Sequence, residues 1–271
     1  MHEAQLRITH PEPRDIPMLE QIWMDVFGDP PELIEAFFDR FDPGLNGWIV
    51  RRGTEILSTA YLIHGNLLIY GDRTQPAAYV YAVATPREHR GKGYGGMLMQ
   101  HFANLAEQRG LLLYTRPASA SLFHWYAETM QTVPAAQLAE RRIPADKSID
   151  PSPVTRLSPA EYGSVRERML ADHPHILFSE PFLTLQETYL SAENGGYYGC
   201  PDGICACEVR GDTLVIKELV AHVAEEAFVQ TLLRHFRLPE ALIPVHTEGG
   251  ESQVAYRGDA PESTSWGLLL D

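Results

Sequence analysis

The chain has 271 residues, of which 44% are hydrophobic and 21% charged, as in a folded globular protein with one large domain or two ordinary ones. Its formal net charge of −14 argues against a protein that binds duplex nucleic acid, which needs a basic surface against the phosphates. No apolar run is long enough to span a membrane, and residues 1–5 lack the pattern of a signal peptide. We therefore expect a cytoplasmic protein.

Apolar periodicity in the first half predicts alternating helices and strands. Breaks rich in proline and glycine, such as Asp29-Pro30-Pro31 and Asp42-Pro43-Gly44, separate the first elements. The expected helices are 13–27, 32–41, 97–109 and 119–130, and the expected strands are 48–52, 56–64, 67–70, 77–85, 111–115 and 137–143. This order predicts an α/β fold, a layered domain with a mixed sheet, over residues 1–147.

The most distinctive stretch joins the strand 77–85 to the next helix. It contains Arg90, Gly91, Lys92, Gly93, Tyr94, Gly95 and Gly96. The first amides of a helix lack intrahelical partners and the helix dipole favours an anion there, so the stretch is suited to hold a phosphate. Glycines let the anion approach these amides. The alternative is a glycine-rich turn that binds nothing; the spacing fits neither a dinucleotide-binding fingerprint nor a Walker loop.

The second half repeats the order of elements after a boundary at 144–159, which contains four prolines. We place the linker at 148–158 and a second domain at 159–271. Its expected helices are 159–171, 181–192 and 224–236, and its expected strands are 197–200, 204–210, 213–221, 242–246 and 266–270. The strand-to-helix junction at 221–223 contains no glycine or arginine, so we expect this copy to lack the phosphate-binding loop.

Two groups of residues could suggest a metal, and neither has the spacing of a known site. Cys200, Cys205 and Cys207 do not form the paired spacing of a zinc site and are interpreted as small apolar residues, two of them on one strand face. His173-Pro174-His175 is interpreted as a polar loop. We therefore expect no metal.

The residues Arg90 to Gly95 resemble the Arg/Gln-x-x-Gly-x-Gly/Ala motif of the GNAT superfamily of acyl-CoA-dependent N-acetyltransferases. Val83-Ala84-Thr85 is similar to the strand end that precedes the motif in this family. Ser119, followed seven positions later by Tyr126, resembles the segment after the fifth strand of the family. The resemblance covers roughly residues 6–143, and it implies an acetyltransferase fold, here in tandem with a degenerate second copy.

The resemblance also implies acetyl-CoA as co-substrate, bound between the strands 79–85 and 111–115. Backbone groups of Val83, Ala84 and Thr85 would pair with the pantetheine arm, and Ser119 would be a further contact. Amides from Gly91 to Gly96 would hold the pyrophosphate, with Arg90 and Lys92 in the same loop. Tyr126 would protonate the departing thiolate as general acid. The acceptor would be a primary amine of a small molecule or peptide, attacked directly without a covalent enzyme intermediate.

The chain departs from the family pattern at two points. Met130 and Gln131 stand where many members have a Gly-Phe pair, and neither of the two strands carries a carboxylate that could act as base. Three alternatives stay open: a tyrosine that only packs, a non-catalytic acyl-CoA sensor, and a second domain that shapes either the acceptor site or a homodimer. The nearby titratable candidates for the base are Glu88, His89, His124 and Glu128, and water relays are an equal alternative.

Overall fold

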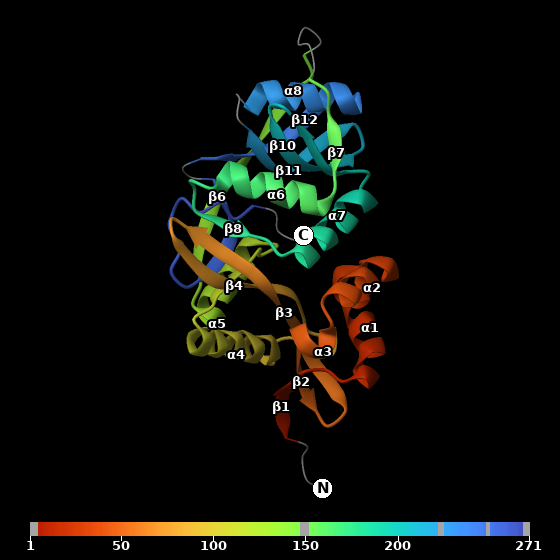
Figure 1. Cartoon of the computed structure of the whole chain (residues 1–271). Coiled ribbons are helices and arrows are strands. Elements are labelled where there is room, and N and C mark those ends of the chain that lie inside the picture. The colour runs from red at the N-terminus through yellow and green to blue at the C-terminus, as the bar shows by residue number, and fades with distance from the viewer. Residues whose placement is uncertain (1–4, 147–151, 222–224, 248–249, 268–271) are drawn as a thin grey trace.

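Strands and helices alternate through both halves of the chain (Figure 1). The computed structural model describes residues 5–146, 152–221, 225–247 and 250–267. The helices are α1 (Ile16–Phe27), α2 (Pro31–Arg40), α3 (Pro43–Asn46), α4 (Tyr94–Arg109), α5 (Ala120–Met130), α6 (Pro159–Leu170), α7 (Glu180–Ala192) and α8 (Glu225–Phe236), with 3-10 turns η1 (Pro13–Asp15) and η2 (Arg87–His89). The strands are β1 (Leu6–Thr9), β2 (Gly47–Arg52), β3 (Glu55–Tyr70), β4 (Arg73–Ala84), β5 (Leu112–Thr115), β6 (Val133–Pro144), β7 (Thr155–Leu157), β8 (His175–Leu177), β9 (Gly196–Cys200), β10 (Gly203–Arg210), β11 (Thr213–Ala221), β12 (Glu240–His246) and β13 (Glu251–Arg257).

The strands form one mixed 13-stranded sheet that runs through both halves. Its order is β1-β2-β3-β4-β5-β13-β6-β12-β11-β10-β9-β7, with β8 paired to β3 outside this path. The β4–β5 and β11–β12 pairs are parallel, whereas the pairs that β13 and β6 make are antiparallel. The fold class is therefore the mixed α/β class that the periodicity predicts.

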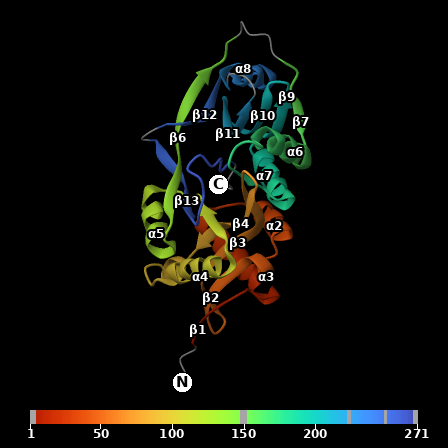
Figure 2. The same ribbon diagram turned by 60° about the vertical axis from the view of Figure 1, so that its left-hand side comes forward.

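The two halves exchange their last strands at the centre of this sheet (Figure 2). β6 leaves the first half and pairs with β12 from Pro144↔Glu240 to Leu138↔His246. β13 returns from the second half and pairs with β5 from Thr115↔Ala255 to Leu113↔Arg257. The first half thus receives a strand that lies more than 130 residues further along the chain than the strand it pairs with.

Helices cover the sheet in two layers, and each layer encloses its own core. In the first half, α4 and α5 pack on one face over Leu98, Phe102 and Leu113. On the other face, α1 and α2 meet α7 of the second half around an aromatic core. That core is shared by both halves and includes Trp23, Phe37, Tyr61, Tyr79, Tyr114, Tyr162, Phe182, Tyr197 and Trp266. α8 covers a separate core on β10 to β12.

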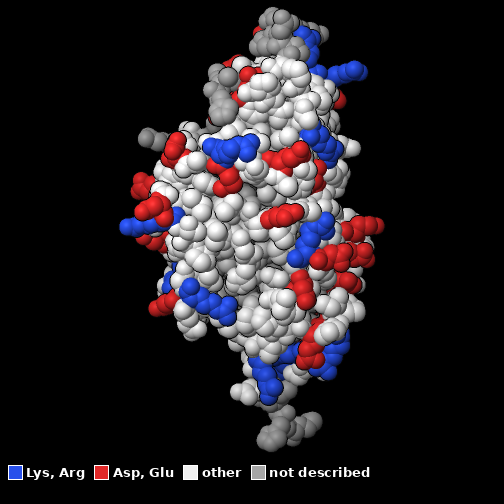
Figure 3. Space-filling model, in the orientation of Figure 1, with Lys and Arg blue, Asp and Glu red and all other residues white. Residues whose placement is uncertain are grey.

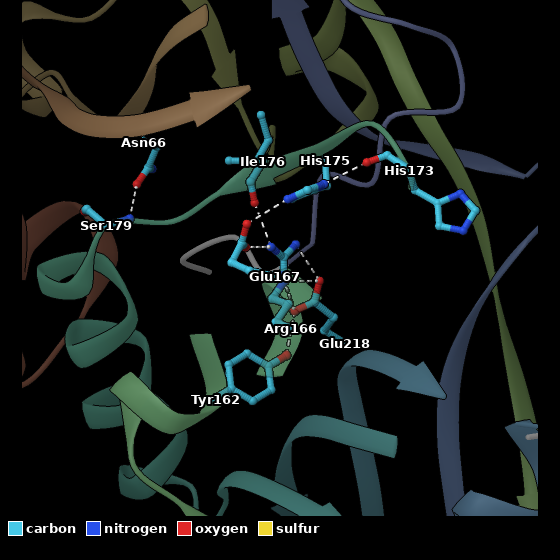
Figure 4. Close-up of polar contacts among 9 residues, drawn as sticks. All are labelled: Asn66, Tyr162, Arg166, Glu167, His173, His175, Ile176, Ser179 and Glu218. Carbon is cyan, nitrogen blue, oxygen red and sulfur yellow. Dashed lines mark hydrogen bonds and ion pairs between the residues drawn. The ribbon is translucent and has the colours of Figure 1, made fainter. Parts of the chain in front are cut away.

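A polar network inside this shared region joins α6 and β11 to β8 (Figure 4). Arg166 is fully buried, and its guanidinium donates to both carboxylate oxygens of Glu218 at 2.9–3.1 Å and to the Ile176 carbonyl at 2.7 Å. The Tyr162 hydroxyl donates to the same carboxylate at 2.6 Å. A buried charge needs such saturation, because an unpaired ion in the interior costs several kcal/mol.

Most of the predicted elements are present, with three corrections. The residues 56–64 and 67–70 form one strand, β3, whose pairing with β4 is irregular between Ile63 and Asn66. The last strand within the described residues is β13. Trp266 and Gly267, the described part of the strand expected over 266–270, form no strand, and 268–271 lie outside the described residues. The residues expected as a polar loop include His175, which is 1% exposed and opens β8.

The cysteine prediction agrees with the fold, because Cys205 and Cys207 lie in the core under α8 as free thiols. Part of the predicted linker and the 221–223 junction fall on residues 147–151 and 222–224, outside the described residues. Within the described ranges, no helix is long and apolar enough to cross a membrane.

Candidate active site

The C-terminal ends of β4 and β5 diverge. The two strands pair in parallel only as far as Tyr79↔Tyr114. Beyond this point β4 bulges. Tyr81 pairs with Tyr61 and Ala84 pairs with Thr59, so the two residues between them on β4 lie opposite a single residue of β3, and Ala82 has a φ of 46°. A bulge bends its strand and ends regular pairing. The Thr115 hydroxyl donates to the Val80 carbonyl at 2.8 Å where the gap begins, and past it β4 and β5 no longer pair with each other.

A cavity of about 850 Å³ lies at this split, within the roughly 300–1,000 Å³ of small-molecule sites. Its walls come from both faces of the sheet. Trp23 and Tyr81 belong to the aromatic core on the α1 side, whereas Val80 and Tyr126 belong to the core under α4 and α5. The cavity therefore passes through the sheet, and two ligands can meet in it from opposite sides. It is lined by Trp23, Phe27, Asp29, Tyr79–Val83, Thr115–Ala120, Leu122, Phe123, Tyr126, Pro134 and Glu251–Gln253.

Tyr126 lies on α5 and lines the cavity beside the split. It is 6% exposed. Burial raises the pKa of the Tyr126 hydroxyl to about 12, against a smaller lowering by a hydrogen bond to the Thr115 side chain. The hydroxyl is therefore protonated at neutral pH and can donate, which is the form that a general acid requires.

The glycine loop forms the start of α4, on the same face of the sheet as α5. Gly91 and Gly93 have φ values of 74° and 82°, the left-handed region that favours glycine. Gly93 is the N-cap of α4, and no side chain caps the helix there. The first intrahelical bond runs from the Met97 amide to the Gly93 carbonyl at 3.0 Å, which leaves the preceding amides for a ligand. This end of α4 has the local geometry of an anion site.

A family model of the acetyltransferase (GNAT) domain matches residues 7–126, which contain the glycine loop, the split strands and Tyr126. Residues 7–126 are a GNAT acetyltransferase domain. No curated protein matches the chain.

Solved structures with the same fold extend over nearly the whole chain. GCN5-related N-acetyltransferases from Kribbella flavida and Anabaena variabilis are similar at 17% and 16% identity, with TM-scores of 0.70 and 0.72. Each comparison covers 93% of this chain and 72% of the other. Eis1 from Mycobacterium abscessus is similar at 17% identity and a TM-score of 0.63, and the comparison covers 94% of this chain and 71% of the Eis1 chain. At these identities the likeness shows the fold.

Within the GNAT domain, the predicted cofactor residues at the end of β4 differ in the hydrogen bonds that their backbone carbonyls accept. Val83 lines the cavity. The Ala84 carbonyl accepts a hydrogen bond from the Ser58 hydroxyl at 2.9 Å, and the Thr85 carbonyl accepts one from Arg90 Nε at 3.0 Å. Arg90 thus closes the loop onto the end of β4. The contacts of all three strand residues with a pantetheine arm stay a prediction.

The remaining predicted residues of the GNAT domain fall into two groups. Gly95 and Gly96 lie on α4 beside α5, and a Cβ at these positions would make ordinary contacts, 3.4 Å from the Trp125 ring and 3.5 Å from Thr129 Cγ2. The Tyr94 side chain is buried and accepts a hydrogen bond from Arg52 Nη2 at 3.0 Å, so only its backbone belongs to the loop surface. Lys92 is exposed on the loop, and Ser119 lines the cavity at the N-cap of α5.

The four candidate bases lie away from the cavity lining. His89 Nε2 is 3.3 Å from Glu55, and His124 Nε2 is 3.2 Å from Glu128 at the exposed surface of α5. Glu88 is exposed on η2. None of them is among the residues that line the cavity, so the geometry favours none as the base.

Sequence reasoning missed two carboxylates that do line the cavity, Asp29 and Glu251. Asp29 stands between α1 and α2, in a stretch that the sequence marks only as a break. Glu251 begins β13, and no local pattern connects it to a site built more than 100 residues earlier. Across the described residues, no three His, Cys, Asp or Glu side chains gather as metal ligands would.

Proposed function

We propose that this protein is an N-acetyltransferase that moves an acetyl group from acetyl-CoA to a primary amine of a small molecule or peptide. One observation carries the proposal: the buried Tyr126 hydroxyl lines a cavity at the β4–β5 split, on the sheet face that also carries the uncapped start of α4. The thioester would lie in the split, and the pyrophosphate would bind the amides of Gly91 to Gly96, with Arg90, Lys92 and Ser119 around them.

The chemistry is a direct transfer. A neutral amine nitrogen attacks the thioester carbon, a C–N bond forms, and collapse of the tetrahedral intermediate breaks the C–S bond. The sulfur leaves as thiolate and takes a proton from Tyr126. A tyrosine with a pKa of about 12 is a weaker acid than a thiol of about 8.5, so this transfer is uphill by itself. It becomes favourable when the acceptor nitrogen loses its proton to water or to a cavity carboxylate and the tyrosinate regains one.

The second half is proposed as a degenerate copy, with the acetyltransferase domain at 1–147, the linker at 148–158 and the copy at 159–271. The order β7-β9-β10-β11-β12 parallels β1-β2-β3-β4-β5, and β11 and β12 also pair in parallel over three residues only. Its contribution to the site is proposed to be the exchanged strand β13, whose Glu251, Ser252 and Gln253 line the cavity. A homodimer interface is the other role proposed for it.

The rival function is an acyl-CoA-binding module without catalysis. Both functions use the glycine loop, but only the enzyme uses the Tyr126 hydroxyl. In the test, the purified protein is incubated with acetyl-CoA and a panel of amines, and free CoA thiol is measured. Tyr126→Phe should lower kcat about 100-fold or more and leave the thermal stabilisation by acetyl-CoA unchanged. Tyr70→Phe, which removes a hydroxyl outside the cavity, is the matched control.

Binding to the loop is tested separately with a pair of glycine variants. Gly93 and Gly71 both have a positive φ, 82° and 59°, and open space where a Cβ would stand. Gly93→Val and Gly71→Val should therefore cost a similar, roughly 1–2 kcal/mol of backbone strain. Only Gly93→Val should abolish the thermal shift with acetyl-CoA. Equal thermal shifts with acetyl-CoA for both variants, or no thermal shift for the unaltered protein, would refute the proposal that the glycine loop binds acetyl-CoA.

A further inference from the structure

The cavity has two chemically different sides. The glycine loop packs against Trp125 and Thr129 of α5, so a cofactor bound there reaches the split from the α5 side. The acceptor then has to reach the split from the opposite, α1 side. On that side the lining is supplied by α1, the α1–α2 turn and the outer face of β4.

Asp29 is the carboxylate on the α1 side. It stands between the last residue of α1 and Pro30, which caps α2, so its backbone is held by a helix on each side. Trp23 Nε1 donates to Asp29 Oδ2 at 2.8 Å. A carboxylate can accept about four hydrogen bonds, so this contact orients the group and leaves capacity for an ammonium.

The other groups on this side are aromatic, and two of them are incompletely covered. Phe27 is 44% exposed and Tyr81 is partly buried, and the buried ring of Trp23 lies between them, 5.8 Å from Phe27 and 5.7 Å from Tyr81. A ligand that covers these rings removes their apolar surface from water, which favours binding. This side therefore offers one negative charge within a mainly apolar wall.

The surface around α1 and α2 has the same sign of charge as Asp29. Acidic side chains gather over these two helices (Figure 3), where Asp25, Glu32, Glu35 and Asp39 are exposed. An acidic surface beside a cavity raises the local concentration of cations and speeds their association. It therefore favours a cationic acceptor over an anionic one.

Taking the proposed function as its basis, we infer that the acceptor is a primary amine whose single ammonium group is carried by an aromatic body, such as an arylalkylamine. Asp29 binds the ammonium, and Phe27 and Tyr81 contact the ring. The ammonium loses its proton to solvent before attack, and the nitrogen then forms the C–N bond. Collapse of the tetrahedral intermediate breaks the C–S bond, and the thiolate takes its proton from Tyr126 as described above. A polycationic acceptor fits less well, because Asp29 and Glu251 are the only carboxylates among the lining residues that the structure describes, and Arg116 lies among them.

The test compares phenylethylamine with butylamine, spermidine and an aminoglycoside as acceptors, by release of CoA thiol. Phenylethylamine should have the highest kcat/KM. Asp29→Asn should raise its KM about tenfold or more, since a charge-assisted contact is lost. The matched control is Asp25→Asn, which removes the same charge from the exposed face of α1, where Asp25 accepts only from Gln21.

A second pair of variants tests the aromatic wall. Phe27→Ala should reduce the preference for phenylethylamine over butylamine about fivefold, and Met18→Ala should leave it unchanged. Met18 is a suitable control because it is 54% exposed on the same helix and does not line the cavity.

Failure of the inference and failure of the proposed function have different signatures. If acetyl-CoA stabilises the protein but spermidine or the aminoglycoside is the better acceptor, the inference is overturned and the proposed function stands. Equal KM values for Asp29→Asn and Asp25→Asn overturn the role of Asp29. If acetyl-CoA gives no thermal shift and no amine releases thiol, both are overturned. The Asp29→Asn protein should itself keep the acetyl-CoA shift, which shows that it is folded.

Discussion

The buried Arg166–Glu218 pair offers the sharpest test of how the second half is held together (Figure 4). Glu218→Gln keeps the shape of the side chain and removes its charge, which leaves the Arg166 guanidinium without its main counter-charge. Both side chains are nearly inaccessible, at 1% and 6% exposure, so solvent cannot replace the lost partner. Removing one partner of such a pair typically costs about 3–5 kcal/mol.

The structure favours the lower end of this range. Glu167 lies 3.3 Å from Arg166 Nη1 and is partly exposed, and the guanidinium also lies 4.8 Å from the centre of the Phe178 ring. These contacts retain part of the stabilisation of the charge. We therefore expect a loss of about 3 kcal/mol and a fall in Tm of roughly 6–12 °C.

The assay is thermal and urea unfolding followed by circular dichroism at neutral pH. Glu128→Gln is the control, because Glu128 pairs with His124 at the surface and its loss should change stability by less than about 0.5 kcal/mol. The triple variant Tyr162→Phe, Arg166→Met, Glu218→Leu replaces the three buried polar side chains that bond to one another and should be more stable than Glu218→Gln, since the guanidinium is removed together with its counter-charge. A single variant as stable as the control, or a triple variant less stable than the single one, would refute the reasoning.

Two further predictions concern the same junction between the halves. Both ring nitrogens of His175 face acceptors, Glu167 Oε2 at 2.8 Å and the His173 carbonyl at 2.7 Å. Burial alone would lower the pKa of His175, but these hydrogen bonds outweigh it and leave the pKa above 6.5. A group whose pKa is higher in the folded than in the unfolded protein stabilises the fold at a pH below its unfolded pKa, and this stabilisation is lost as the pH rises through the folded pKa. The Tm difference between the unaltered protein and Glu167→Gln should therefore shrink between about pH 6 and pH 9. A Tm difference that stays constant over this range would contradict the prediction. Separately, a chain ending at residue 147 lacks β13 and leaves β5 with an unpaired edge, so it should be insoluble or fail to show a thermal shift with acetyl-CoA; a soluble fragment with the full shift would show that the exchanged strand is dispensable.

The local sequence predicted much of the element framework and the position of the glycine loop at the start of α4. Helical spacing located α1, α2, α4 and α5, because each buries one apolar stripe. The glycine loop was recognisable because its geometry depends on a few consecutive residues with special backbone freedom. The short strands β1, β7 and β8 were missed, since three or four residues carry too little periodicity to predict a strand.

The α1 side of the cavity is decided by tertiary structure. Asp29 is an ordinary turn residue in the sequence and lines the cavity only because α1 packs beside β4. The three lining residues of β13 come from the other half, through a strand exchange that follows from pairing between distant segments. Hydrophobic pattern predicts which face of a strand is buried but not which neighbour it pairs with, because the backbone hydrogen bonds are the same for every partner.

Arg166 and His175 show the same division. The sequence predicts a helix around Arg166 and a polar loop around His175, and no local pattern predicts that either side chain is buried, because charged side chains are rarely buried without partners. Glu218, 52 residues beyond Arg166, supplies the partner for the arginine, and Glu167 supplies one for the histidine. The sequence by itself thus determined the kind of elements and the glycine loop, which depend on neighbours along the chain. Only the tertiary structure decided the exchanged strand, the buried charges and the α1 side of the cavity, which depend on neighbours in space.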